Sequence, residues 1–167
     1  MKLFTTLAAA TLAALSVTTP AQAGTVEAYQ LLKMIESTGT TVSLNPNSYD
    51  ESCKGIAGYY VFEPKVQDIF VVCTDQVNIK DSDELWEVVS HESTHVMQAC
   101  NGGLVFEEAY LPRTFRELER KAPHYAKLID EKYTGDDTAI EAEAFWMELQ
   151  PPSHVLSYFE DICLNKK

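Results

Sequence analysis

The sequence predicts one α+β domain that is mostly helical and carries a small β-hairpin ahead of its longest helix. Apolar residues recur at helical spacing over most of the chain. Two short segments rich in aromatic and β-branched residues stand close together between residues 57 and 73. A helix, a hairpin and then a run of helices, in that order, is typical of α+β domains.

The first 23 residues have the pattern of a secretory signal peptide. Lys2 precedes an apolar stretch, and Ala21-Gln22-Ala23 forms a small-residue cleavage site. Hydroxyl residues interrupt the stretch, which is shorter than the roughly 20 apolar residues that a membrane-spanning helix needs. We therefore expect residues 1–23 to be removed near Ala23, the protein to be periplasmic or secreted, and one mature domain to span residues 24–167.

The net charge excludes some classes of binding partner, and the cysteines indicate an oxidising compartment. A net charge of −12 repels nucleic-acid phosphates and anionic lipid headgroups, so we expect neither nucleic acid nor a membrane as a partner. We also expect a monomer. Four cysteines in an exported chain indicate two disulfides, and their spacing is too wide for a zinc cluster. Of three possible pairings, we expect Cys53 with Cys73 and Cys100 with Cys163.

Start and stop signals divide the chain into elements. We expect a helix over 26–37, a loop over 38–48 with a short strand at 40–44, hairpin strands at 57–62 and 68–73, and a helix over 82–100. Asp81 or Ser82 can cap the long helix, and Asn101-Gly102-Gly103 ends it. Pro112 and Pro123 divide the region that follows into two or three short helices. Two more helices then span about 135–150 and 153–164.

The segment His91-Glu92-Ser93-Thr94-His95 is the one short motif with a metal-site mechanism behind it. Residues four apart lie on the same helix face, roughly 6 Å between Cβ atoms, so both imidazoles can reach one zinc ion. Glu92 lies about 100° further round the helix, close enough to touch a water on the metal. Zinc lowers the pKa of that water towards about 7, and Glu92 can then act as the general base. The alternative is a helix that carries two histidines by chance.

Two segments resemble those of a known enzyme group. Ser90 to Gln98 (SHESTHVMQ) resembles the active-site helix of zincin metallopeptidases, in particular the gluzincins, which use a glutamate as the third zinc ligand. Ile140 to Trp146 (IEAEAFW) is similar to the Glu-x-x-Ala helix that supplies this glutamate in several gluzincin families. The resemblance implies a compact zincin-like domain that hydrolyses peptide or protein substrates. It also implies Zn²⁺ as cofactor, with His91, His95 and Glu141 as its ligands and Glu92 as the catalytic base.

The third ligand has alternatives. Glu143 can replace Glu141, and the two side chains point about 200° apart on a helix, so only one can face the metal. Glu141 also fits a capping box that begins at Thr138, in which its carboxylate only bonds the start of the helix. The gluzincin families often carry an acidic residue where Phe145 stands here. A different residue must then accept the second N–H of the zinc-binding histidines.

Other roles remain open. The resemblance assigns residues 68–73, the strand before the active-site helix, to backbone pairing with an extended substrate, whereas the alternative is an ordinary core hairpin. His154 and the pair His124-Tyr125 are candidates to stabilise the transition-state oxyanion, or else belong to the surface. Gln98 lies on the face of His91, but no role is assigned to it. The alternative function is a non-catalytic zinc-binding module or a disulfide-stapled interaction protein.

Overall fold

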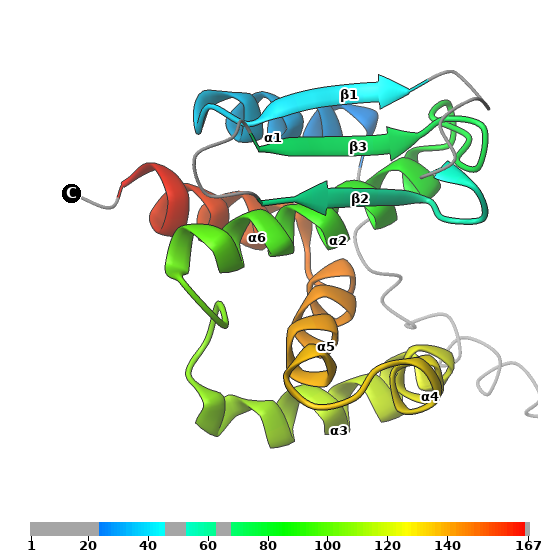
Figure 1. Cartoon of the computed structure of the whole chain (residues 1–167), viewed down its shortest axis with the longest axis vertical. Coiled ribbons are helices and arrows are strands. Elements are labelled where there is room, and N and C mark those ends of the chain that lie inside the picture. Colours follow the sequence, from blue (N-terminus) through cyan, green and yellow to red (C-terminus); the bar gives the residue numbers. More distant parts are fainter. Residues whose placement is uncertain (1–23, 46–52, 63–67, 166–167) are drawn as a thin grey trace, which may run out of the picture.

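The computed structural model describes residues 24–45, 53–62 and 68–165, and it confirms the α+β class: helices dominate and the sheet is small. The predicted signal peptide lies outside the described residues. Figure 1 shows the sheet on one side of α2, with α3 and α4 on the side away from it. The elements are α1 (Thr25–Ser37), β1 (Thr41–Asn45), β2 (Gly58–Val61), β3 (Ile69–Cys73), α2 (Ser82–Asn101), η3 (Glu108–Tyr110), α3 (Leu111–Lys121), α4 (Pro123–Lys132), α5 (Asp136–Glu148), α6 (Pro152–Phe159) and η4 (Glu160–Leu164).

The sheet has the strand order β1-β3-β2. Strands β2 and β3 pair antiparallel, as the predicted hairpin requires, and β1 adds in parallel to the other side of β3. The expectation that residues 68–73 offer an open sheet edge to a substrate is therefore wrong. Because β1 takes the free side of β3, the central strand has both of its edges paired, and β2 becomes the edge strand that contacts α2.

Helix α2 is the central element of the domain. The Asp81 side chain accepts hydrogen bonds from the main chain of Asp83 and Glu84, and Gly102 ends the helix in the left-handed conformation (φ 72°) that glycine adopts without steric cost. The helix contacts α1, β2 and α5. Its apolar face joins a core whose largest buried members include Leu31, Ile35, Phe70, Leu85, Val89, Met97, Met147 and Phe159. These contacts fix the position of the histidine motif.

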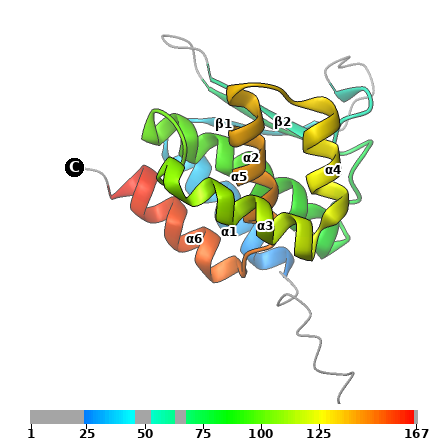
Figure 2. The same ribbon diagram turned by 90° about the horizontal axis from the view of Figure 1, so that it is seen from below.

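A second, smaller core holds α5 against α3 and α4. Its buried members are Leu118, Ile129, Ala142 and Phe145. Pro112 and Pro123 stand in the first turns of α3 and α4, where proline costs no hydrogen bond, so they separate the helices as predicted. Figure 2, seen from below, shows α3 and α4 covering this side of the molecule. Helix α5 thus lies between the two cores.

Both predicted disulfides are confirmed. Cys53, in the turn before β2, bonds Cys73 at the end of β3, and Cys100 in the last turn of α2 bonds Cys163 in η4. Such bonds persist in oxidising compartments, which fits the expected export. Among the described residues, no helix has both the length and the apolar character that crossing a bilayer requires.

Candidate metal centre

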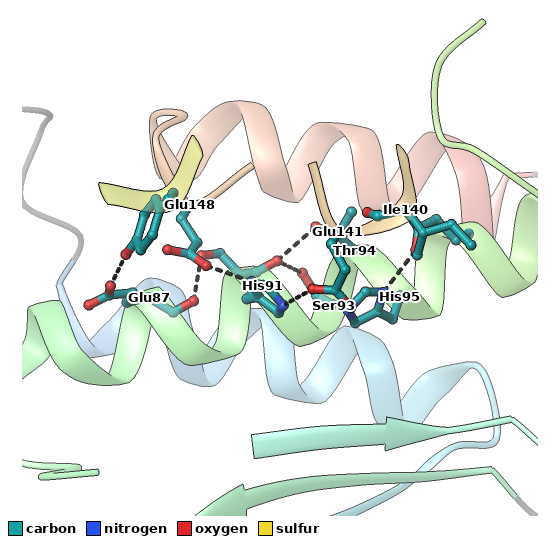
Figure 3. Close-up of polar contacts among 11 residues, drawn as sticks. Glu87, His91, Ser93, Thr94, His95, Ile140, Glu141 and Glu148 are labelled. Atoms are coloured by element: carbon teal, nitrogen blue, oxygen red, sulfur yellow. Dashed lines mark hydrogen bonds and ion pairs between the residues drawn. The ribbon is translucent and has the colours of Figure 1, made fainter. Parts of the chain in front are cut away.

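The structure brings the three predicted metal ligands together at the contact between α2 and α5. His91 Nε2 lies 3.4 Å from one Glu141 carboxylate oxygen, and His95 Nε2 lies 3.6 Å from the other. One potential ligand atom from each of the three residues falls within 4.8 Å of the others. Figure 3 shows Glu141 pointing toward both histidines. The two imidazoles and one carboxylate form a donor set that Zn²⁺ commonly binds.

The polar residues between the two histidines are accommodated by hydrogen bonds within α2. Ser93 and Thr94 are fully buried, and both hydroxyls donate to the Ser90 carbonyl oxygen, at 2.9 Å each. Ser93 lies on the side of the helix roughly opposite the two histidines, and His91 and His95 face Glu141 of α5. The side chains of these histidines are 14% and 18% exposed, so the site is sheltered but open to solvent.

Glu141 and Glu143 differ in the hydrogen-bond partners of their carboxylates. The buried Glu143 carboxylate accepts hydrogen bonds from the main-chain N–H groups of Val105 (2.7 Å) and Phe106 (2.9 Å) and from Gln98 Nε2 (3.1 Å). Glu141 Oε2 is buried and has no hydrogen-bond partner. Glu143 therefore has a structural role, whereas Glu141 has an oxygen available to a cation.

The capping-box alternative for Glu141 is wrong. Helix α5 begins at Asp136, with Gly135 as its N-cap and no side-chain capping bond. Glu141 lies in the second turn of the helix, too far along to bond the main chain at its start. A capping box would require the helix to begin at Thr138, whereas it begins at Asp136, as the predicted start near residue 135 implies.

Each histidine donates its other ring N–H to a fixed partner. His91 Nδ1 lies 2.6 Å from Glu148 Oε1, and His95 Nδ1 lies 2.8 Å from Gln98 Oε1. The Gln98 amide nitrogen donates to the carbonyl oxygen of Ile140 and to Glu143, so its oxygen is the atom left to accept from His95. In the neutral imidazoles that a metal requires, this arrangement places the proton on Nδ1 and directs the Nε2 lone pair toward Glu141.

Glu148 is the partner that the sequence did not identify. The gluzincin families often carry an acidic residue at the position of Phe145, and Glu148 stands three residues after it. The Phe145 ring instead packs edge-on against the His91 ring, with 4.6 Å between the ring centroids. The spacing of seven residues from Glu141 places Glu148 two turns away on the same face of α5. This spacing was the sequence signal that could have placed Glu148 on the same helix face as the predicted ligand Glu141.

A cavity of about 450 Å³ opens beside His91 and Glu92. Tyr125 and Tyr133 line it, whereas His124 and His154 do not and are exposed. Of the two roles left open for these histidines, the structure therefore supports the surface one: His124 lies on α4 beside Tyr125, and His154 lies on α6 near Tyr158. Burial raises the pKa of Tyr133, and the charge of Glu141 and a hydrogen bond to its carboxylate act in the same direction.

The sequence matches, over residues 23–164, the family described as a domain of unknown function (DUF8637). The chain belongs to this family. No curated protein and no solved structure matches the chain.

Three carboxylates of this DUF8637 domain, from Glu92, Glu141 and Glu148, lie close to His91. Burial lowers the pKa of His91, but the carboxylates of Glu141 and Glu148 outweigh burial and raise that pKa to about 10. Burial and the charge of His91 lower the pKa of His95. Burial raises the pKa of Glu92 to about 7, close to the value that suits a general base at neutral pH. The site therefore combines a strong affinity for positive charge with a base beside it.

Proposed function

We propose that the chain is a zinc-dependent peptidase that resembles the gluzincins, with His91, His95 and Glu141 as zinc ligands and Glu92 as the catalytic base. One observation carries the proposal: two imidazoles and a carboxylate from two helices converge within 4.8 Å, next to a cavity that Glu92 also lines. A metal-binding module needs the ligands alone. A base at the cavity wall is what hydrolysis needs in addition.

The residues fit a zinc ion. Glu141 Oε2 is buried without a hydrogen-bond donor and faces His91 Nε2, and the other carboxylate oxygen faces His95 Nε2. Glu148 and Gln98 hold the imidazoles in the orientation that ligation requires. When bound, zinc supplies a Lewis acid that polarises a carbonyl and lowers the pKa of water towards about 7.

Glu92 is placed to move a proton at the cavity. Its side chain is 8% exposed, and the Tyr60 main chain hydrogen-bonds its carboxylate. Gly58 allows β2 to approach Glu92, because a Cβ at this position would stand 3.2 Å from Glu92 Cγ. Glu92 can accept a proton from the attacking water and pass it to the leaving amine.

The outer edge of β2 supports an extended substrate. Cys73 N–H donates to the Ala57 carbonyl oxygen, so in the antiparallel pattern Gly58 and Tyr60 direct their main-chain groups away from β3. Of these groups, Tyr60 N–H already donates to Glu92, so a substrate would pair with the Gly58 end of the strand. Gly58 also lines the cavity beside Glu92. An extended peptide that paired with this edge would lie next to the proposed base.

Metal analysis and peptide cleavage test the proposal together. The mature protein should contain about one zinc per chain, which H95A loses, and chelator should abolish cleavage until zinc is restored. E92Q should keep the zinc and lose cleavage of a mixed peptide library. Zinc without cleavage by either protein would favour the non-catalytic zinc-binding module. A native protein that binds no zinc would contradict both functions.

A further inference from the structure

We propose that the cavity beside the metal centre selects substrates that carry a lysine or arginine side chain next to the hydrolysed bond. The inference rests on the proposed peptidase function and names its substrate class. The cavity contacts Glu84, Glu87, Val88, His91 and Glu92 of α2 and therefore extends from the site toward the start of this helix. It is placed to receive a side chain that neighbours the reacting carbonyl.

The lining of the cavity is acidic. It includes four carboxylates, from Glu84, Glu87, Glu92 and Glu148, and among its lining residues no lysine or arginine opposes them. Glu84 accepts a hydrogen bond from the Asn78 main chain at the start of α2, and Glu92 belongs to the proposed catalytic machinery. Glu87 and Glu148 remain as the carboxylates that can meet a substrate.

Glu148 has an unused oxygen inside this wall. Its side chain is 5% exposed, its Oε1 accepts from His91, and its Oε2 is buried with no hydrogen-bond partner. The Tyr125 hydroxyl lies beside both Glu87 and Glu148, but it carries one proton and donates it to Glu87. A buried carboxylate oxygen without a donor is costly, and an ammonium or guanidinium group would supply both the donors and the opposite charge.

The remaining walls fit the stem of a long cationic side chain. They are formed by Ile56, Val77, Val88, Leu128 and Phe145. Lysine and arginine cover apolar surface with their methylene groups while the charged end reaches a polar partner. A small cation would leave these walls without contact, and an acidic side chain would be repelled by Glu87 and Glu148 (Figure 3).

The first experiment varies one substrate position in the zinc-loaded native protein. Peptides that differ only in lysine, arginine, citrulline, norleucine or glutamate at that position are compared by kcat/KM. We expect at least about tenfold higher values for lysine over norleucine and for arginine over the isosteric citrulline. Equal cleavage of all five peptides would overturn this inference and leave the peptidase proposal intact.

Two variants and a control separate charge recognition from cavity shape. E87Q should reduce the preference for lysine to less than about twofold. Y125F removes the hydroxyl that occupies Glu87 and should keep or raise the preference. E131Q, on an exposed glutamate of α4 outside the cavity, should leave it unchanged. Loss of preference in Y125F as well as in E87Q would mean that the pair only shapes the cavity, and would overturn the proposal.

A binding measurement decides the inference even if no peptide is cleaved. Titration calorimetry compares lysine and norleucine peptides on native protein, with and without zinc, and on zinc-loaded E92Q. We expect lysine peptides to bind about tenfold more tightly, and E87Q to remove the difference. Failure of cleavage alone would reject the peptidase function. Equal affinity for both peptides, or no binding of either, would reject the cationic specificity.

Discussion

Glu141 and Glu143 are two carboxylates of the same helix that differ in what surrounds them. Glu143 is 1% exposed and is held by two main-chain N–H groups and Gln98, whereas Glu141 contacts the two histidines. The contacts with His91 and His95 lower the pKa of Glu141 even though burial acts in the other direction. The two side chains thus point to opposite sides of α5, where Glu141 can bind a metal and Glu143 holds the main chain of residues 105 and 106.

The two roles predict separable variants. E141Q should lose its bound zinc with little change in the stability of the zinc-free protein. E143A leaves the N–H groups of Val105 and Phe106 without an acceptor and should lower the free energy of unfolding by about 3 kcal/mol. Zinc content and denaturant titration in chelator measure the two effects. If E141Q kept its zinc and a folded E143A lost it, Glu143 and not Glu141 would be the zinc ligand.

Gln98 connects the proposed metal centre to the fold. It accepts from His95 and donates to Ile140 and Glu143, so it transmits the position of α5 to an imidazole on α2. Q98L removes these bonds at similar volume and should weaken zinc affinity about 10- to 100-fold. Competition with a chromophoric chelator gives the affinity. Q30L, on the exposed face of α1, serves as control, and equal affinities in both variants would exclude this role for Gln98.

Local spacing predicted some of these residues and not others. His91, Glu92 and His95 follow from one helical period, and Glu141 follows from a short resemblance. The contact of Glu148 with His91 depends on how α5 packs against α2, 57 residues apart in sequence, which no local pattern determines. Conversely, Pro123 and Pro151-Pro152 made His124 and His154 stand out beside turns, but helix packing directs both away from the cavity.

At the scale of elements, the approach of β2 to α2 depends on Gly58. A Cβ there would stand 2.8 Å from both the Val71 carbonyl oxygen and Val88 Cγ1. G58A should therefore destabilise the domain by about 1–3 kcal/mol and lower peptide cleavage more than zinc content, because β2 must move from Glu92. Thermal unfolding, zinc analysis and cleavage rates measure these effects. Unchanged stability and cleavage in G58A would show that a Cβ fits at this position and that the approach of β2 to α2 does not depend on glycine.

The contact between α3 and α5 predicts that the stability of the domain falls at acidic pH. Trp146 Nε1 donates to Glu117 at 2.8 Å, and this bond, opposed by burial and assisted by Lys121 and Arg113, lowers the pKa of Glu117. A lowered folded-state pKa stabilises the protein above the ordinary value of 4.5, and the contribution is lost as pH falls through the folded-state value. E117Q should therefore lose less stability than native protein between neutral and acidic pH, in denaturant titrations. A matching pH dependence in both proteins would contradict this.

Strand order is the part of the fold that sequence patterns did not determine. The hairpin follows from two segments rich in aromatic and β-branched residues, α1 follows from helical spacing, and the ends of α2 follow from its capping and stop residues. The parallel addition of β1 to β3 depends instead on where α1 packs, since α1 contacts both α2 and β1. Such a long-range pairing gives no local signal, so the prediction placed the open edge on the wrong strand.

For the whole molecule, zinc would join α2 to α5 and thus connect the two cores. At free zinc about 100-fold above Kd, the native protein should gain about 2.7 kcal/mol of stability. For a domain of this size we expect Tm to rise by about 10 °C. Calorimetric scans with zinc, with magnesium and with chelator measure the change. The same rise in H95A would place zinc at another site.

The Cys100–Cys163 bond sets an order of events in biosynthesis. It spans 63 residues, and the loop it closes contains Glu141 and Glu148. The bond can form only after this entire loop has entered an oxidising compartment. In an exported chain, the segment that would complete the proposed metal centre is therefore fastened to α2 only after translocation. A peptidase assembled in this order would acquire its stable, active form outside the cytoplasm of the cell that makes it.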